Sequence, residues 1–282
     1  MYYLILYIGA ALVFIQGFRF AQLRRMNLFA VAAVNYVTAA VIAVVIYAAH
    51  FNGTFAFDPR AAAMGATTGS LYFIHLFVLL AAYRLVGTGV TMAIVNAASI
   101  VPVVVAHLLW PHTETMSSTR WVAVGMLPVV MILMRPTRAS SVHFGFKTDC
   151  ILLLNLVLAG TNLTLHKFAT TLEIDGVRNG YHLVLFVTAA IVSTGYALWY
   201  RLKPVKAELG IGVLIGTANG AVTLLILYGI TALTAVVFYL IAAPTTITLV
   251  LASSMLLWHE RITPRQALGI ALAISVVIIS RQ

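Results

Sequence analysis

Long runs of apolar residues, separated by short polar turns, occupy almost the whole chain. Most of these runs are long enough to cross the ~30 Å hydrocarbon core of a bilayer as a helix, which takes about 20 residues. The pattern predicts ten helices, with approximate bounds 3–20, 28–50, 61–83, 91–110, 121–134, 149–166, 178–200, 208–228, 234–257 and 266–280. We therefore expect an all-α polytopic membrane protein with ten transmembrane helices.

The two halves of this pattern repeat at a nearly constant spacing. Gly65-x-x-x-Gly69 in the third predicted helix recurs 147 residues later as Gly212-x-x-x-Gly216 in the eighth. Small residues at this spacing let membrane helices approach each other closely. The 147-residue repeat also makes Tyr72 the counterpart of Asn219. We therefore expect both side chains to point to a place where helices 3 and 8 meet.

The repeat suggests a division of the chain into two five-helix parts. The first covers 1–134, a linker covers 135–147, and the second covers 148–282. Because each part has an odd number of helices, the second must be inverted in the membrane relative to the first. Inverted repeats of this kind place a substrate site near the middle of the bilayer, between the halves.

The last two predicted helices form a hairpin with a distinctive pattern. Pro244 lies within the first of them, the turn that follows has the form Glu260-Arg-x-Thr-x-x-Gln, and the final helix contains Gly269. This pattern resembles an EamA domain of the drug/metabolite transporter superfamily. The resemblance implies a ten-helix bacterial exporter or facilitator of small metabolites in the inner (plasma) membrane.

Composition supports a membrane protein and excludes several other classes. Apolar residues make up 62% of the chain and charged residues 9%, against about 25% charged residues in soluble domains. The 17 basic residues outnumber the 7 acidic ones, but they are scattered near predicted helix ends, which is typical of topology signals rather than of nucleic-acid binding. A single cysteine, Cys150, excludes an internal disulfide and a multi-cysteine metal site.

Basic residues on alternate predicted loops also indicate an orientation. One side of the membrane receives 12 of them and the other receives 5. The positive-inside rule places the richer side in the cytoplasm and both termini outside, whereas the family resemblance implies cytoplasmic termini. Arg19 and Lys167, at the ends of two helices, are expected to extend to the membrane interface.

The acidic residues all lie in predicted loops or at the ends of predicted helices, where Asp149 and Glu208 are first residues, and none lies inside a span. A proton-coupled exchanger of organic cations usually needs a carboxylate inside the membrane, because burying an unpaired charge there is costly. The sequence therefore favours a neutral, zwitterionic or anionic solute. Any coupling to protons would have to use histidine.

Polar side chains within the predicted spans are the candidate substrate ligands. Asn155 and Asn162 lie on one stripe of the sixth helix. We expect the two tyrosines of the set to stack on or hydrogen-bond a substrate, the asparagines to bond its polar groups, and the histidine to confer pH sensitivity. The full set is Tyr72, His75, Asn96, Asn155, Asn162, Asn219 and Tyr239. The competing interpretation is structural, because such residues also bond neighbouring helices, for ~0.6 kcal/mol each.

These features favour a transporter that moves a small polar or aromatic metabolite by alternating access. One alternative is a translocator of a lipid-linked molecule, which predicts a cavity open to lipid. Another is a membrane scaffold or accessory subunit, which predicts a filled centre in which the asparagines pair with one another. An enzyme is not expected, because hydrolase, kinase and dinucleotide-binding motifs are missing. The expected partners are a small-molecule substrate and membrane lipid, with no cofactor and no nucleic acid, in a monomer or homodimer.

Overall fold

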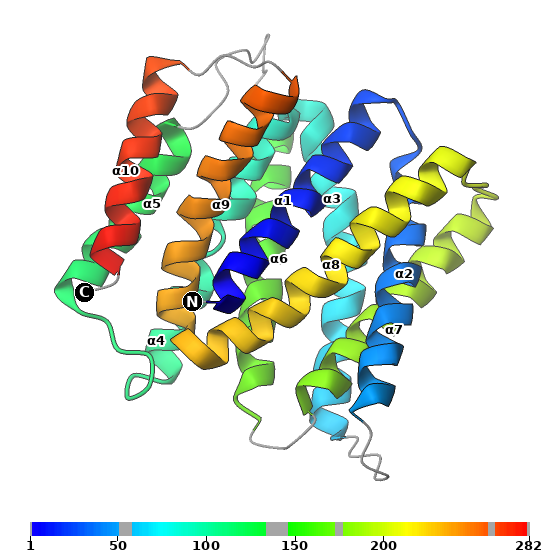
Figure 1. Ribbon diagram of the computed structural model, residues 1–282, viewed down its shortest axis with the longest axis horizontal. Helices are drawn as coiled ribbons and strands as arrows, with labels where there is room; N and C mark the ends of the chain where they lie inside the picture. The colour runs from blue at the N-terminus through cyan, green and yellow to red at the C-terminus, as the bar shows by residue number, and fades with distance from the viewer. Residues whose placement is uncertain (1, 51–57, 134–145, 173–176, 259–262, 281–282) are drawn as a thin grey trace. The chain divides into compact units, whose positions relative to one another are not determined.

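The computed structural model describes residues 2–50, 58–133, 146–172, 177–258 and 263–280 (Figure 1). In these ranges the secondary structure is helical, without a strand. The helices are α1 (Tyr2–Leu23), α2 (Leu28–Ala49), α3 (Pro59–Ala97), α4 (Ile100–Leu109), α5 (Ser118–Leu133), α6 (Phe146–Thr170), α7 (Val177–Trp199), α8 (Lys206–Leu233), α9 (Ala235–Trp258) and α10 (Pro264–Ser280). Most of the predicted linker, 135–145, and Glu260 of the hairpin motif lie outside the described residues, whereas 146–147 already belong to α6.

Among the described residues, seven helical stretches are long and apolar enough to cross a membrane. They are Tyr2–Leu23, Leu28–Ala49, Pro59–Tyr83, Phe146–Thr170, Arg178–Trp199, Lys206–Leu233 and Ala235–Leu257. The helices at the remaining predicted spans, α4, α5 and α10, have 10, 16 and 17 residues. These helices are therefore compatible with a multi-pass membrane protein.

The predicted break between the third and fourth helices, at 84–90, is wrong. α3 continues as a helix to Ala97, and the interruption comes at Ala98 and Ser99. The physical reason lies in Pro102. In an uninterrupted helix its ring would clash with the carbonyl of Ala98, four residues earlier, and its nitrogen has no hydrogen to donate. No proline is present in 84–90 to end the helix there.

Local capping explains why two helices begin where they do. The Asn27 side chain accepts hydrogen bonds from the backbone N–H groups of Phe29 and Ala30, at 3.1 and 3.3 Å, and so caps α2. Asp58 caps α3 in the same way, accepting from the backbone N–H of Arg60 at 2.7 Å. Hydrogen bonds from Arg60 lower the pKa of the Asp58 carboxyl below its ordinary value.

The described chain divides into two compact units, and each contains helices from both predicted halves. Unit 1 consists of Met1–Ile74 and Phe168–Tyr228, and thus holds α1, α2, the first part of α3, α7 and most of α8. Unit 2 consists of His75–Lys167 and Gly229–Gln282, and holds α4, α5, most of α6, α9 and α10.

In unit 1 the glycines of α3 form a close contact with α7. A Cβ atom placed on Gly65 would lie 3.0 Å from the Val184 Cβ, and one placed on Gly69 would lie 3.0 Å from the Thr188 Cβ. Such distances are tighter than ordinary carbon–carbon contacts. The absence of side chains at these two positions therefore allows the two helices to approach.

The glycines of α8 make the corresponding contact with α2. A Cβ placed on Gly212 would lie 2.6 Å from the Val34 Cβ, and one on Gly216 would lie 2.6 Å from the Thr38 Cβ. Val34 and Thr38 precede the two α7 partners of the α3 glycines by 150 residues each, nearly the spacing that separates the glycines themselves. The two contacts in unit 1 are thus reciprocal, each joining one helix of the first half to one of the second.

α2 also shows how this protein distributes its apolar side chains. It packs along α7 in unit 1 (Figure 1). Its buried positions are mostly small, namely Ala30, Ala32, Ala33, Ala39, Ala40 and Ala43. Its exposed large positions are branched, namely Val37, Val41, Val44 and Val45. Large apolar groups outside and small groups inside suit a helix whose outer face contacts lipid.

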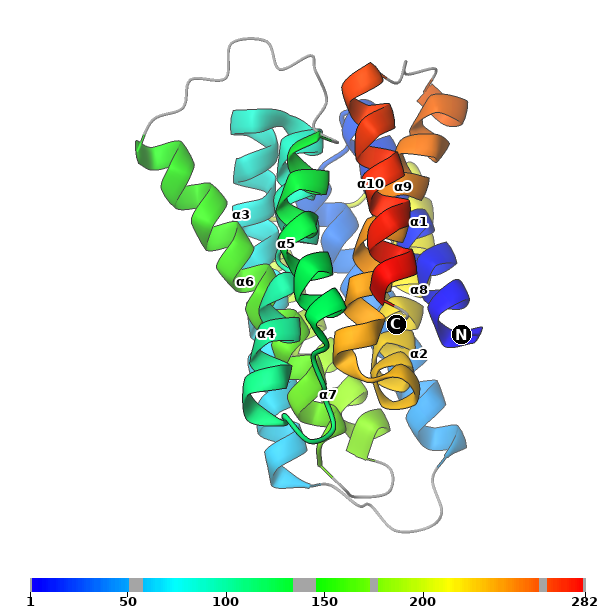
Figure 2. The ribbon, with the colours of Figure 1, turned by 90° about the vertical axis from the view of Figure 1, so that its left-hand side faces the viewer.

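Unit 2 is built around α9. This helix packs against α4 and α10, and α10 packs in turn against α5 (Figure 2). The connection that leads into α9 is a single residue, Thr234, since α8 continues to Leu233 rather than ending near Tyr228 as predicted. Thr234 has a φ angle of 68°, a strained value for a β-branched residue.

Candidate functional site

The predicted site residues divide between the two units. Tyr72 and Asn219 belong to unit 1. The other five, His75, Asn96, Asn155, Asn162 and Tyr239, belong to unit 2. The local geometry of each group is distinct, and the buried predicted residues that have an atom without a partner in the described chain belong to unit 2.

In unit 2 a histidine of α3 meets an asparagine of α6. The His75 Nε2 atom lies 2.8 Å from the Asn155 Oδ1 atom, and because an amide oxygen only accepts, Nε2 is the donor. Asn155 is fully buried, yet its Nδ2 group has no hydrogen-bond partner in the described chain. One side of this amide is therefore satisfied, and the other presents unused N–H donors.

Two further buried polar groups in unit 2 share this property. Asn162, 4% exposed, has an Oδ1 atom without a partner in the described ranges, and so does the Oγ1 atom of Thr246, 3% exposed. Asn162 follows Asn155 by seven residues, which is two turns, so both lie on one face of α6. Leaving a buried donor or acceptor unpaired costs about 1–3 kcal/mol.

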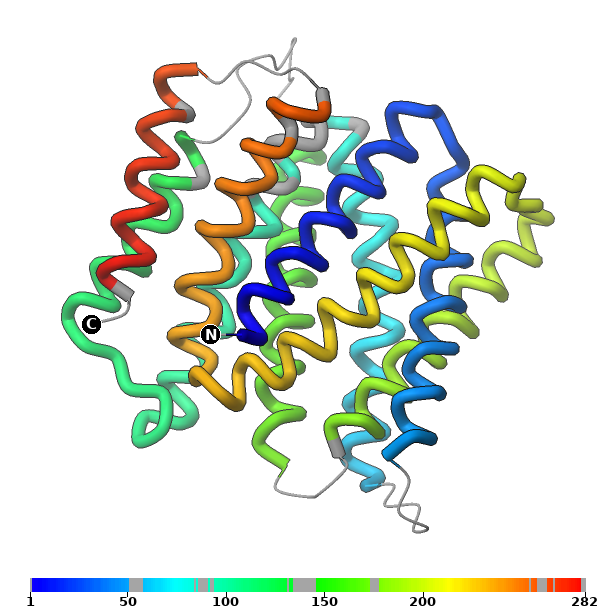
Figure 3. Tube along the Cα trace, viewed as in Figure 1, coloured from blue at the N-terminus to red at the C-terminus, as the bar shows by residue number. Residues whose placement is uncertain are grey.

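α9 carries a matching stripe. Tyr239 precedes Thr246 by seven residues on one face of α9. The Tyr239 hydroxyl donates to the Leu163 carbonyl of α6 at 3.0 Å, which directs this face towards α6. The two helices run in opposite directions (Figure 3). Tyr239 therefore lies at the level of the Asn162 turn, and Thr246, two turns along α9, at the level of the Asn155 turn.

The resulting arrangement is an uncharged polar stripe between two helices, which we call the α6–α9 stripe. Its unpaired atoms are the Asn155 Nδ2 donor, the Asn162 Oδ1 acceptor and the Thr246 hydroxyl, which both donates and accepts. Partners for these atoms would have to supply both hydrogen-bond acceptors and donors. Asn96 contributes differently, because its backbone carbonyl accepts the Ser99 hydroxyl at 2.7 Å, next to the break before α4.

The two predicted site residues of unit 1 are engaged with neighbouring helices. The Tyr72 hydroxyl lies 3.4 Å from Thr223 Oγ1 on α8, which agrees with the expected meeting of helices 3 and 8. Asn219 instead donates through Nδ2 to Asn35 Oδ1 on α2 at 3.2 Å. The expectation that both would point to a junction of α3 and α8 therefore holds for Tyr72 and is wrong for Asn219.

Sequence reasoning missed His182 of α7. Its side chain is fully buried in unit 1, and its Nε2 atom donates to the Gly220 carbonyl of α8 at 3.0 Å. The Nδ1 atom has no partner among the described residues. The spacing of three residues from Asn179, whose Oδ1 is also unpaired in the described chain, was the signal available in the sequence.

Sequence reasoning also missed a buried ion pair in unit 2. Lys167 was expected to extend to the membrane interface, but it is 8% exposed and its Nζ lies 2.5 Å from Glu114 Oε1. The same carboxylate accepts the backbone N–H groups of Ala235 and Val236, each at 3.0 Å. Glu114 thus joins the end of α6 to the start of α9.

Comparison with known proteins shows the fold. No family model and no curated protein matches the chain. A solved crystal structure, described only as that of a protein, matches with a TM-score of 0.75 at 14% sequence identity, over 98% of this chain and 95% of the other. At this identity the likeness concerns the fold alone. In the ranges that the structure describes, no group of three or more His, Cys, Asp or Glu side chains is placed to hold a metal ion.

Proposed function

We propose that the protein is a ten-span inner-membrane transporter of a small polar or aromatic metabolite, similar to members of the drug/metabolite transporter superfamily, and that it works by alternating access. The α6–α9 stripe is the observation that carries this proposal. Three buried polar atoms without partners in the described chain would each cost about 1–3 kcal/mol if nothing bonded them. A substrate that hydrogen-bonds to them offsets this cost, which is how a site discriminates a polar ligand from an apolar one.

The chemistry of the stripe defines the class of substrate. An amide donor, an amide acceptor and a hydroxyl suit a ligand that is uncharged or zwitterionic and has donors and acceptors side by side. No acidic residue contributes to the stripe, so an organic cation would have no counter-charge there. His75 contributes by orienting Asn155, because its Nε2–H occupies the Asn155 oxygen and leaves the amide N–H group for the ligand.

The reciprocal glycine contacts of unit 1 support the inverted-repeat part of the proposal. Helix pairs α3–α7 and α8–α2 meet through glycines with no side chain between the backbones. Small residues at such contacts let helix backbones approach closely. We propose that the two halves use them as the surfaces on which they move.

The scaffold alternative has one observation in its favour. It predicts asparagines paired with each other across helices, and Asn219 is paired with Asn35 in this way. The unpaired atoms of Asn162 and Thr246 favour a ligand instead. The two candidate functions therefore predict opposite results in a binding experiment.

The experiment is a melting screen of the purified protein in detergent against amino acids, amines, nucleobases, sugars and organic anions. A ligand at ~100 times its dissociation constant adds about 2.7 kcal/mol of stability. We expect a shift from one uncharged or zwitterionic class. Thr246→Val and Asn162→Leu should each abolish it, because they remove the polar atoms at nearly constant volume.

The matched control is Thr248→Val. The Thr248 hydroxyl is on the same helix, but it already donates to the Pro244 carbonyl at 2.8 Å. The ligand shift should therefore survive this change. A compound that shifts the melting temperature is then tested for uptake into proteoliposomes. Absence of any shift, or equal loss in the control, would favour the lipid-linked or scaffold function.

A further inference from the structure

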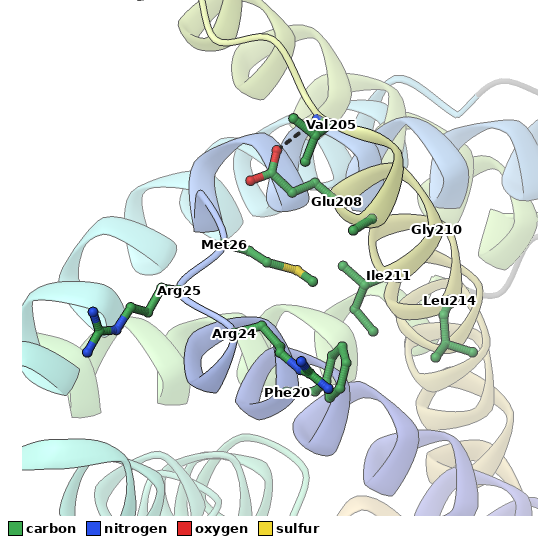
Figure 4. Close-up of a pocket in the computed structure, with 10 residues that line it drawn as sticks. Phe20, Arg24, Arg25, Met26, Val205, Glu208, Gly210, Ile211 and Leu214 are labelled. Atoms are coloured by element: carbon green, nitrogen blue, oxygen red, sulfur yellow. Dashed lines mark hydrogen bonds between the residues drawn. The ribbon is translucent and has the colours of Figure 1, made fainter.

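Unit 1 contains a second feature with the chemistry of a binding site, at the ends of helices rather than within the spans. An open pocket of about 700 Å³ lies where α1 ends, α2 begins and α8 begins (Figure 4). We call it the α1–α8 pocket. It is separate from the α6–α9 stripe, which belongs to unit 2.

The wall of the α1–α8 pocket is mainly apolar. Phe20, Met26, Ile211 and Leu214 line it, and Leu214 is half exposed. The backbone at the end of α1 directs Met26 into the pocket. Its N–H bonds to the Ala21 carbonyl at 3.0 Å in a Schellman-type helix end (Figure 4). Exposing this apolar surface to water costs free energy, whereas contact with lipid chains is favourable.

The rim of the pocket is cationic. The Arg24 guanidinium lies 5.4 Å from the Phe20 ring centroid, whereas the Arg25 side chain points away from Arg24 and the other labelled lining residues (Figure 4). Both arginines are exposed, and neither forms an ion pair with a described residue. These two charges are therefore available to an anion.

The acidic residue of the pocket does not neutralise this rim. Glu208 is buried, and one of its oxygens accepts the backbone N–H of Asn27 at 2.7 Å. The other accepts the backbone N–H of Val205 at 3.0 Å (Figure 4). Its charge therefore stabilises the start of α8, as the helix dipole favours. The lining therefore carries two arginine charges against one carboxylate charge, and its net charge is positive.

We propose that the α1–α8 pocket binds one anionic phospholipid. The phosphate contacts Arg24, Arg25 adds a positive charge at longer range, and the first acyl carbons lie over Phe20, Ile211 and Leu214. α1 and α8 are both long enough to span a bilayer, so their ends lie at the level of lipid head groups. Basic pockets between membrane helices are known to select anionic head groups. This inference does not depend on transport.

The test uses the full chain in neutral detergent and native mass spectrometry with short-chain phosphatidylglycerol or phosphatidylcholine at equal concentration. We expect a clear preference for phosphatidylglycerol. Each of Arg24→Gln and Arg25→Gln should weaken that binding, by about fivefold, because a basic residue near an anionic lipid contributes about that factor in affinity. The effect should be larger at Arg24, which contacts the phosphate. Leu214→Asn should weaken it as well, because the acyl chain loses an apolar contact.

Arg201→Gln is the matched control. Arg201 is exposed, ends α7 with a φ of 51° as Arg25 ends α1 with 53°, and does not line the pocket. It should keep wild-type binding, and all variants should melt like the wild type without lipid. The proposal is overturned if the Arg24/Arg25 double variant retains the preference, or if Arg201→Gln loses it equally. It is also overturned if soluble glycerol phosphate binds as tightly as the lipid, which would identify a free anion as the ligand.

Discussion

Replacing Glu114 with glutamine tests how the start of α9 is held in unit 2. The Glu114 carboxylate is 1% exposed and bonds to the Lys167 ammonium and to two backbone N–H groups in the first turn of α9. Glutamine has nearly the same shape and keeps one acceptor oxygen. The change therefore removes the charge while disturbing the packing very little.

The expected loss follows from what remains after the change. Removing one partner of a buried ion pair costs about 3–5 kcal/mol, because the other charge is left buried without compensation. Two features place Glu114→Gln near the lower end. The retained oxygen still caps α9, and the Trp110 ring, 5.4 Å from the Lys167 Nζ, contributes a cation–π interaction of about 0.5–2 kcal/mol. We expect unfolding free energy to fall by about 3 kcal/mol.

The assay is a double-mutant cycle measured by denaturant unfolding in detergent micelles. It compares Glu114→Gln, Lys167→Met and the double variant. The double variant leaves no unpaired charge, so it should be at least about 2 kcal/mol more stable than the sum of the two single losses predicts. Asp149→Asn is the control, since this exposed carboxylate in the first turn of α6 should change stability by less than about 0.5 kcal/mol.

Two results would refute this reasoning. The first is a loss below about 1 kcal/mol for Glu114→Gln, which would mean that the carboxylate behaves as an exposed one. The second is simple additivity of the two single changes, which would mean that Glu114 and Lys167 do not interact in the folded protein.

Three further predictions concern the backbone and the helix caps. Gly69→Ala should lower stability by about 1–3 kcal/mol, since its Cβ would press on the α7 backbone, whereas Gly125→Ala, which has no atom within 4 Å, should be neutral or stabilising in melting experiments. Thr234→Gly should raise stability by about 1 kcal/mol in denaturant unfolding, because it releases the strain of a β-branched residue at a φ of 68°; a loss would show that the threonine is not strained. Asp58→Asn should flatten the acid limb of the stability curve. Arg60 lowers the pKa of Asp58, so the carboxylate stabilises the fold above its ordinary pKa of 3.8 and this contribution is lost as the pH falls below it; an unchanged acid limb would contradict the cap.

Helix positions were largely predictable because their signals are local. Asn27 before α2 and the Asp58–Pro59 pair before α3 are start signals that need no tertiary partner. The break before α4 lies at Ala98 and Ser99 rather than at the predicted 84–90, which contains two glycines but no proline, whereas Pro102 follows the observed break. Proline removes a hydrogen bond and clashes with the preceding turn, whereas glycine is merely less favourable in a helix.

Contacts between helices were only partly predictable. The glycines of α3 and α8 were correctly expected to be packing positions, but a residue without a side chain carries no mark of its partner, so their contacts with α7 and α2 come from the structure. Of the candidate site, Asn155 and Asn162 were placed on one face of the sixth predicted helix from their spacing. Thr246, on the facing helix, could not be assigned to the same stripe until the direction and facing side of α9 were known.

The sequence by itself determined that this protein is helical, apolar and compatible with many membrane spans, because those properties depend on each residue and its near neighbours. A helix satisfies its own backbone hydrogen bonds, so its existence needs no information about the rest of the chain. Only the tertiary structure decided which polar groups are paired. Asn219 has a partner in Asn35, Lys167 has one in Glu114, and Asn162 Oδ1 has none in the described chain. The physical reason is that a side-chain hydrogen bond reaches about 3 Å, so its formation depends on which helix faces meet and at what height.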